Sequence, residues 1–243
     1  MELDESKSEE IKVINTIDKS NWLQVFSANL GKMMAIQSRV DEYVIKNRNW
    51  SVDFTKGTIS FGDDVYPMQL IGSESKTSNT WNWGWNNVNH FSDSLIVLAN
   101  QTLSVGESWK LDPLTIPQFE LDDVFNGHNL SIVVCGLSDD KYFYYRGPHS
   151  GGAVFMAIEN PSKEIFAPIG IQEFIGLIIQ CIQRDDVDHK IFVEALLEWN
   201  KTQFEWNGNV LTAHFDQDLS ITFEQDGLDY YISAVTQINN KIC

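Results

Sequence analysis

The stretch Thr80-Trp81-Asn82-Trp83-Gly84-Trp85-Asn86-Asn87 decides how the first half of this chain is interpreted. In an extended backbone, successive side chains point to opposite faces. We therefore predict a strand over residues 81–86 in which three indoles share one face. Neighbours on one face of a strand lie about 7 Å apart, which suits a continuous aromatic wall.

Two interpretations of this wall stay open. Exposed indoles could stack on a base or a sugar ring, because an aromatic face binds without requiring one hydrogen-bond pattern. Buried indoles would instead fill the core beneath a helix, which is the commoner fate of large apolar side chains at regular strand spacing.

The segments around the wall alternate between helical and strand patterns. Apolar residues at spacings of three and four predict a long amphipathic helix that starts at Ser20, its cap, and ends near Asn47. Short strands are predicted over 50–54, 58–61 and 65–71. A helix is predicted from Phe91 to Leu103, closed by Gly106.

Residues 130–137 suit either a strand or a helix, because both spacings fit the apolar positions. Beyond them, two strands over 142–145 and 153–158 are predicted to flank a loop over 146–152. Asn160-Pro161-Ser162 is the predicted boundary to the second half.

The second half is predicted to hold two helices, over 171–182 and 191–199, and then a four-stranded antiparallel meander over about 202–236. Asn207-Gly208 and Asp226-Gly227 are typical of its tight hairpin turns. The fold class is therefore α+β. The expected organisation is a flexible acidic lead over 1–18, an α+β domain over 19–160, and the helix pair with the meander over 161–243.

The chain is strongly acidic, with 34 acidic and 17 basic residues and a formal net charge of −17 over 243 residues. Such a surface repels phosphate backbones and anionic lipids, so we expect neither nucleic acid nor a membrane as a partner. A basic protein would be attracted instead. The alternative is that the charge serves only solubility.

The three cysteines, Cys135, Cys181 and Cys243, form no Cys-x-x-Cys pair, so the sequence supports no zinc ribbon or redox site. The polar, acidic start is unlike a signal peptide, and residues 165–182 are too interrupted for a membrane span. We therefore expect a cytoplasmic protein without cofactors.

Sequence signals for catalysis are weak. The chain has no His-Glu-x-x-His run and no dinucleotide or phosphate-loop fingerprint, and no catalytic residue is assigned. The acidic run Asp185, Asp186, Asp188 is predicted to cap a helix rather than to bind a metal. Arg146 and His149 on the predicted loop, with Tyr145, could bind an anion or move a proton.

Several segments together resemble a bacterial domain family of unknown function. They are the run from Trp50 to Phe61, the stretch 66–73, and the Trp strand, whose Ser/Thr-Trp-x-Trp-x-Trp-x-Asn pattern ends at Asn87. The segments 127–130 and 144–148 resemble the later half of the same family. The likeness covers about residues 20–160 and implies a helix over 127–137, but it implies no activity.

Two functional hypotheses follow. The first is a non-enzymatic protein-binding protein of the immunity or accessory kind, whose acidic face covers a basic partner. The second is an enzyme or small-ligand binder for an aromatic, sugar-like or anionic ligand. Its expected ligand-binding residues are Trp81, Trp83, Trp85, Asn87, Tyr145, Arg146 and His149.

Overall fold

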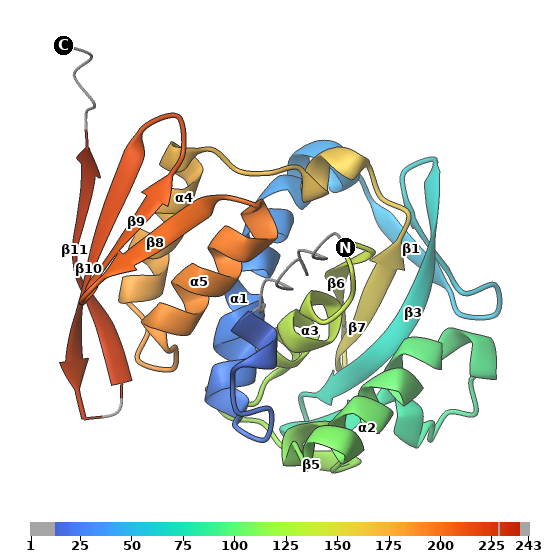
Figure 1. The fold of residues 1–243 in the computed structure, drawn as a ribbon. Coiled ribbons are helices and arrows are strands. Elements are labelled where there is room, and N and C mark those ends of the chain that lie inside the picture. The colour runs from blue at the N-terminus through green and yellow to red at the C-terminus, as the bar shows by residue number, and fades with distance from the viewer. Residues whose placement is uncertain (1–12, 228, 239–243) are drawn as a thin grey trace, which may run out of the picture.

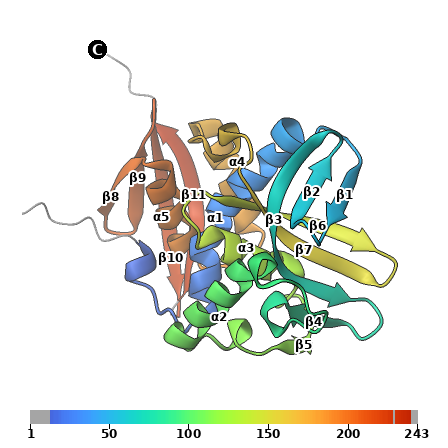
Figure 2. The same ribbon diagram turned by 90° about the vertical axis from the view of Figure 1, so that its right-hand side faces the viewer.

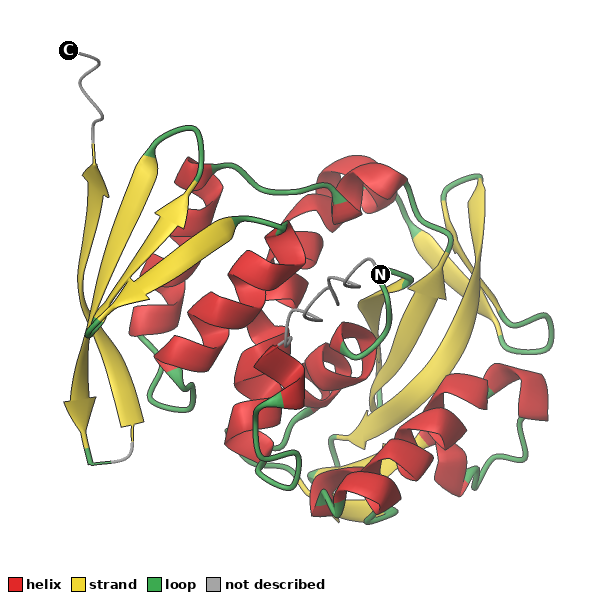
Figure 3. Ribbon diagram, viewed as in Figure 1, coloured by secondary structure: helices red, strands yellow, loops and turns green. Residues whose placement is uncertain are grey.

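The computed structural model describes residues 13–227 and 229–238. Two antiparallel sheets lie at opposite ends of the molecule, with helices between them (Figure 1). Helices and strands are both well represented along the chain, which confirms the α+β class (Figure 3).

The first sheet belongs to the first half of the chain, and all of its pairings are antiparallel. Its longest strand, β3, pairs with β2 through its first residues and with β4 and β7 through its later ones. The strands are β1 (Trp50–Asp53), β2 (Thr58–Phe61), β3 (Asp64–Ser75), β4 (Thr80–Trp83), β5 (Gln118–Glu120), β6 (Tyr142–His149) and β7 (Gly152–Glu159).

Helix α1 (Trp22–Val40) runs through the middle of the molecule and continues into a π-helical turn over Asp41–Ile45. It packs against α3 (Gly127–Gly136) on the side of the first sheet and against the second half of the chain on the other side (Figures 1 and 2). The amphipathic helix is thus confirmed. Its N-cap, however, is Asn21 rather than Ser20, because the Asn21 side chain accepts a hydrogen bond from the backbone of Gln24.

The second half forms the predicted helix pair and meander. Helices α4 (Ile171–Ile182) and α5 (His189–Asn200) precede the strands β8 (Gln203–Asn207), β9 (Val210–His214), β10 (Asp218–Asp226) and β11 (Asp229–Ile238), which pair in sequence order. Gly31 of α1 lets α5 approach closely, since a Cβ there would lie 3.0 Å from the Cβ of Leu196. The domain boundary at 160–162 stays a prediction.

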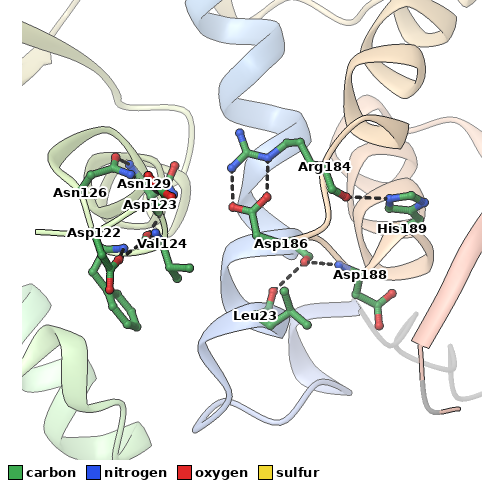
Figure 4. A network of polar contacts seen from close by, with 12 residues as sticks. Leu23, Asp122, Asp123, Val124, Asn126, Asn129, Arg184, Asp186, Asp188 and His189 are labelled. Atoms are coloured by element: carbon green, nitrogen blue, oxygen red, sulfur yellow. Dashed lines mark hydrogen bonds and ion pairs between the residues drawn. The ribbon is translucent and has the colours of Figure 1, made fainter.

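Of the acidic run before α5, Asp188 caps the helix, as predicted. Asp188 is the N-cap residue of α5, and its carboxylate accepts a hydrogen bond from the backbone of Ile191. The backbone N–H of Asp188 donates to Ser27 of α1, and Asp186 pairs with Arg184 at 2.6 Å (Figure 4). The Asp188–Ser27 hydrogen bond joins the α4–α5 connection to α1.

Three predicted element boundaries are wrong. The strand over 81–86 ends at Trp83. The helix predicted from Phe91 is α2 (Val97–Trp109), which includes Gly106 and is followed by its C-cap residue Lys110, with φ of 55°. The loop predicted over 146–152 is a short turn at 150–151, because β6 extends to His149 and β7 begins at Gly152. Residues 1–12 of the predicted acidic lead lie outside the described residues.

Candidate functional site

Trp81 and Trp83 share one face of β4, and neither has any exposed surface. Their rings meet edge to face at 5.3 Å, and Trp81 also contacts Phe155 of β7 at 5.5 Å. The Trp83 indole N–H donates to the carbonyl of Pro113 at 3.0 Å. These indoles belong to the core, so no ligand can stack on them in this structure.

Trp85 does not continue the row, so the predicted three-indole wall is wrong. The chain leaves the strand after Trp83 and forms a 3-10 turn over Gly84–Asn86. Gly84 allows this turn because a Cβ there would lie 2.7 Å from the carbonyl oxygen of Leu70. Trp85 is half-buried, and its indole N–H has no hydrogen-bond partner among the described residues.

The opposite face of β4 forms the floor of a groove of about 510 Å³. Asn82 lies between Ser73 of β3 and Gln118 of β5, and Thr80 lies next to Ser75. Because cross-strand neighbours project to the same side of a sheet, these hydroxyl and amide side chains form one polar surface. β4 and β5 lie side by side at the foot of the sheet in Figure 2.

Two loops form the walls of this groove. One follows β4 and contributes Asn87, Val88 and Phe91. The other is the β6–β7 hairpin, which contributes His149 and Gly151. Asn87 is held by its own loop, because its side chain exchanges hydrogen bonds of 2.8 and 3.0 Å with the backbone of Phe91.

The remaining predicted site residues lie elsewhere. Tyr145 packs edge to face against Trp50 and Phe61, at 5.5 and 5.0 Å. Arg146 faces the indole side of the sheet, where its Nε lies 3.7 Å from the carboxylate of Glu74. The structure therefore brings Asn87 and His149 together at the groove but separates Tyr145 and Arg146 from it.

A second, apolar pocket lies beyond the edge strand β5 and has a volume of about 410 Å³. Its apolar walls come from the start of α1, the segment before β5, and β5 itself. They are Trp22, Leu111, Pro113, Ile116, Phe119 and Phe125. Ile116 keeps 44% of its surface exposed, so this pocket is open to solvent.

Acidic side chains outnumber basic ones at the apolar pocket. Asp112 and Glu120 line it, together with one lysine, Lys110. Residues 107–123 as a whole carry five acidic side chains and one basic one, and all five carboxylates are exposed. The pocket thus combines an apolar interior with an acidic rim.

The buried thiols are held in their neutral form. Burial raises the pKa of Cys181 to about 12 and raises the pKa of Cys135 still further above its ordinary value. A thiolate is the reactive form of cysteine, so these two side chains behave as core residues. Cys243 lies outside the described residues.

The described part of the chain contains no group of three or more His, Cys, Asp or Glu side chains placed to hold a metal ion. Within the same residues, no helix has the combined length and apolar character that a membrane span needs.

Residues 23–161 match the model of a family of unknown function, DUF6882. The match covers more than half of the chain. The chain belongs to the DUF6882 family. Neither the curated proteins nor the solved structures provide a significant match.

All of the groove residues fall inside the DUF6882 region, as does the apolar pocket except for Ser20 and Trp22. The resemblance to a family of unknown function is confirmed, and membership in this family assigns no activity to the chain. The helix pair and the meander lie outside the DUF6882 match.

Most of the groove residues were not predicted from the sequence, because the predicted site used the indole face of residues 81–86 and not the face that carries Asn82. The available signal was the alternation itself, since Thr80 and Asn82 alternate with Trp81 and Trp83. The partners Ser73 and Gln118 could not be found this way, because strand register is needed to place them beside Asn82.

Proposed function

We propose that this protein is a non-enzymatic binding protein of the immunity or accessory kind, acting in the bacterial cytoplasm on a basic protein partner. The net charge of −17 favours encounter with such a partner through complementary potentials. Charge alone also fits a purely soluble protein, so the proposal depends on a surface where charge and apolar contact coincide.

The apolar pocket beyond β5 is that surface and is the observation that carries the proposal. Protein interfaces draw most of their affinity from apolar or aromatic anchors that fill a pocket, while the polar rim supplies specificity and steering. Here the pocket beside Ile116 and Phe119 accepts an anchor, and Asp112 and Glu120 attract lysine or arginine next to it. The preferred partner surface is therefore an apolar side chain flanked by basic ones.

The alternative of an aromatic ligand pocket has less support. It required three accessible indoles near Arg146 and His149, but Trp81 and Trp83 are fully buried. Arg146 also faces away from His149, toward Glu74.

The proposal is tested with a fluorescently labelled peptide of alternating lysine and leucine, compared with one of alternating lysine and serine. Anisotropy titrations at low and high salt should show that the leucine peptide binds more tightly and that its affinity falls steeply with salt, because exposed charges are screened. Ile116→Ser should lower the affinity for the leucine peptide by about tenfold, which is the effect of losing a moderate interface anchor.

Charge reversal at one site should separate local from general attraction. Glu120→Lys reverses a charge on the pocket rim, whereas Glu205→Lys makes the same change at an exposed position on β8 of the other sheet. Glu120→Lys should lower the affinity for the leucine peptide clearly more than Glu205→Lys does. Equal effects of the two variants, or an affinity that does not change with salt, would overturn the proposal.

A further inference from the structure

The groove on the Asn82 face is almost free of charge, which is unusual in a chain where 21% of residues are charged. Glu74 is the one charged residue among those that line it. Its carboxylate, however, points to the indole side, where it accepts a hydrogen bond from the backbone of Gly127 at 2.9 Å and faces Arg146. The polar side chains that line the groove are therefore neutral hydroxyls and amides, with one histidine. Glu120, which pairs with Thr80 on this face of the sheet, is not among them.

The groove floor is held in place by its own hydrogen bonds. Asn82 accepts from the side chain of Asn86 at 2.8 Å, and Thr80 contacts the hydroxyl of Ser78 at 2.8 Å. Beneath them the packed indoles fix the strands, because a Cβ on Gly72 would lie 2.3 Å from the Trp81 ring. A floor ordered before binding loses little freedom when it meets a ligand.

This floor still offers donors and acceptors to a ligand. Among the described contacts, none engages the Ser73 hydroxyl or the Gln118 side-chain oxygen, although the Gln118 amide nitrogen donates to Thr80 at 3.3 Å. The Nδ1 of His149 accepts from the backbone of Gly151 at 3.1 Å, which in the neutral ring places the proton on Nε2 as a donor. Donors and acceptors are thus interspersed along the groove.

The loop wall adds apolar surface. Val88 is 59% exposed, and Phe91 is braced by stacking on Phe54 at 5.1 Å. A ligand that suits both walls must carry hydroxyl groups on one side and C–H surface on the other. It must also be uncharged, since no counter-charge lines the groove and a buried unpaired charge is costly.

We propose that this groove binds a neutral polyhydroxylated ligand of the carbohydrate class. Each sugar hydroxyl both donates and accepts, which matches the mixed lining, and the sugar ring's C–H face matches Val88 and Phe91. The groove volume lies within the range of small-molecule sites. The proposed protein partner uses a different pocket, on the Phe119 side of β5, so the two proposals can be tested separately.

Isothermal titration calorimetry with four probes tests the inference on the whole chain. Maltotriose, cellotriose and triacetylchitotriose are neutral, whereas trigalacturonic acid is a charged sugar of the same length. We expect at least one neutral trisaccharide to bind and to bind more tightly than the charged one. Binding of none of the neutral sugars, or tighter binding of trigalacturonic acid, would overturn the inference.

Variants then locate the site. Gln118→Met keeps the length of an exposed side chain and removes its hydrogen bonds, and Ser73→Ala removes one hydroxyl. Each variant should lower the affinity for the trisaccharide by about threefold or more, which is the contribution of one net hydrogen bond. Gln203→Met makes the same change on exposed β8 and should leave the affinity unchanged. An affinity unaffected by both groove variants would place the ligand elsewhere and refute the assignment.

Discussion

Replacing Trp83 by phenylalanine should cost more stability than the same replacement at Trp81. Both indoles are fully buried and lie on the same face of β4. They differ in one respect. The Trp83 N–H donates to the carbonyl of Pro113, whereas the Trp81 N–H has no hydrogen-bond partner among the described residues. The pair of variants therefore compares a hydrogen-bonded buried N–H with an unpaired one.

The magnitude follows from what each variant removes. Both lose ring volume, at a similar cost. Trp83→Phe also leaves the carbonyl of Pro113 without its donor, which costs roughly 1–3 kcal/mol. Trp81→Phe instead removes an unpaired buried donor, whose penalty is of the same order and is recovered. We expect the Trp83 variant to be less stable than the Trp81 variant by about 2 kcal/mol or more.

Urea denaturation followed by circular dichroism measures this difference, provided that both variants keep the same slope of free energy with urea. For a chain of this length, the midpoint of thermal unfolding should differ by about 4–8 °C. Equal losses, or a larger loss at Trp81, would refute the assignment of the buried hydrogen bond.

Three further predictions concern packing and burial. Gly72→Ala should lower the free energy of unfolding by about 2–3 kcal/mol, because its Cβ would lie 2.7 Å from the carbonyl oxygen of Asn82. Gly176→Ala, in open space on α4, should instead raise it by about 0.5–1 kcal/mol in urea denaturation, and similar effects of the two variants would contradict this packing. Burial raises the pKa of Glu194 above its ordinary value of 4.5. The stability that comes from protonated Glu194 is therefore fully present below pH 4.5 and is lost as the pH rises through the raised pKa of the folded state. Glu194→Gln keeps the acceptor for the Trp206 N–H and should be more stable than the wild type near neutral pH but not in acid. A stability difference that does not change with pH would count against a raised pKa at Glu194. Iodoacetamide should leave Cys135 and Cys181 unmodified in the native protein and label both in urea, as peptide mass spectrometry would show; rapid native labelling of either would contradict its burial.

Local sequence signals were sufficient for much of the fold. The meander could be predicted because its turns carry glycines that tolerate positive φ, and Gly208 and Gly227 both have φ of 63°. The α5 cap could be predicted because Asp188 acts on its own helix. Such features depend on neighbours along the chain.

Features that depend on tertiary contacts could not be predicted. The Trp strand ends at Trp83 because Gly84 packs against the backbone of Leu70. The helix after it starts late because Asn87, with φ of 42°, holds Phe91 in a loop. The groove depends on the register that places Ser73, Asn82 and Gln118 in one row. Alternation shows that a polar face exists, but not which segments complete it.

The most direct test of which face of β4 meets solvent is a solvent paramagnetic relaxation measurement by NMR on the ¹⁵N-labelled protein. A soluble gadolinium chelate should broaden the side-chain amide signals of Asn82 and Gln118 and leave the indole N–H signals of Trp81 and Trp83 sharp. Broadened indole signals beside protected amides would show that the indoles, and not the polar row, form the accessible surface.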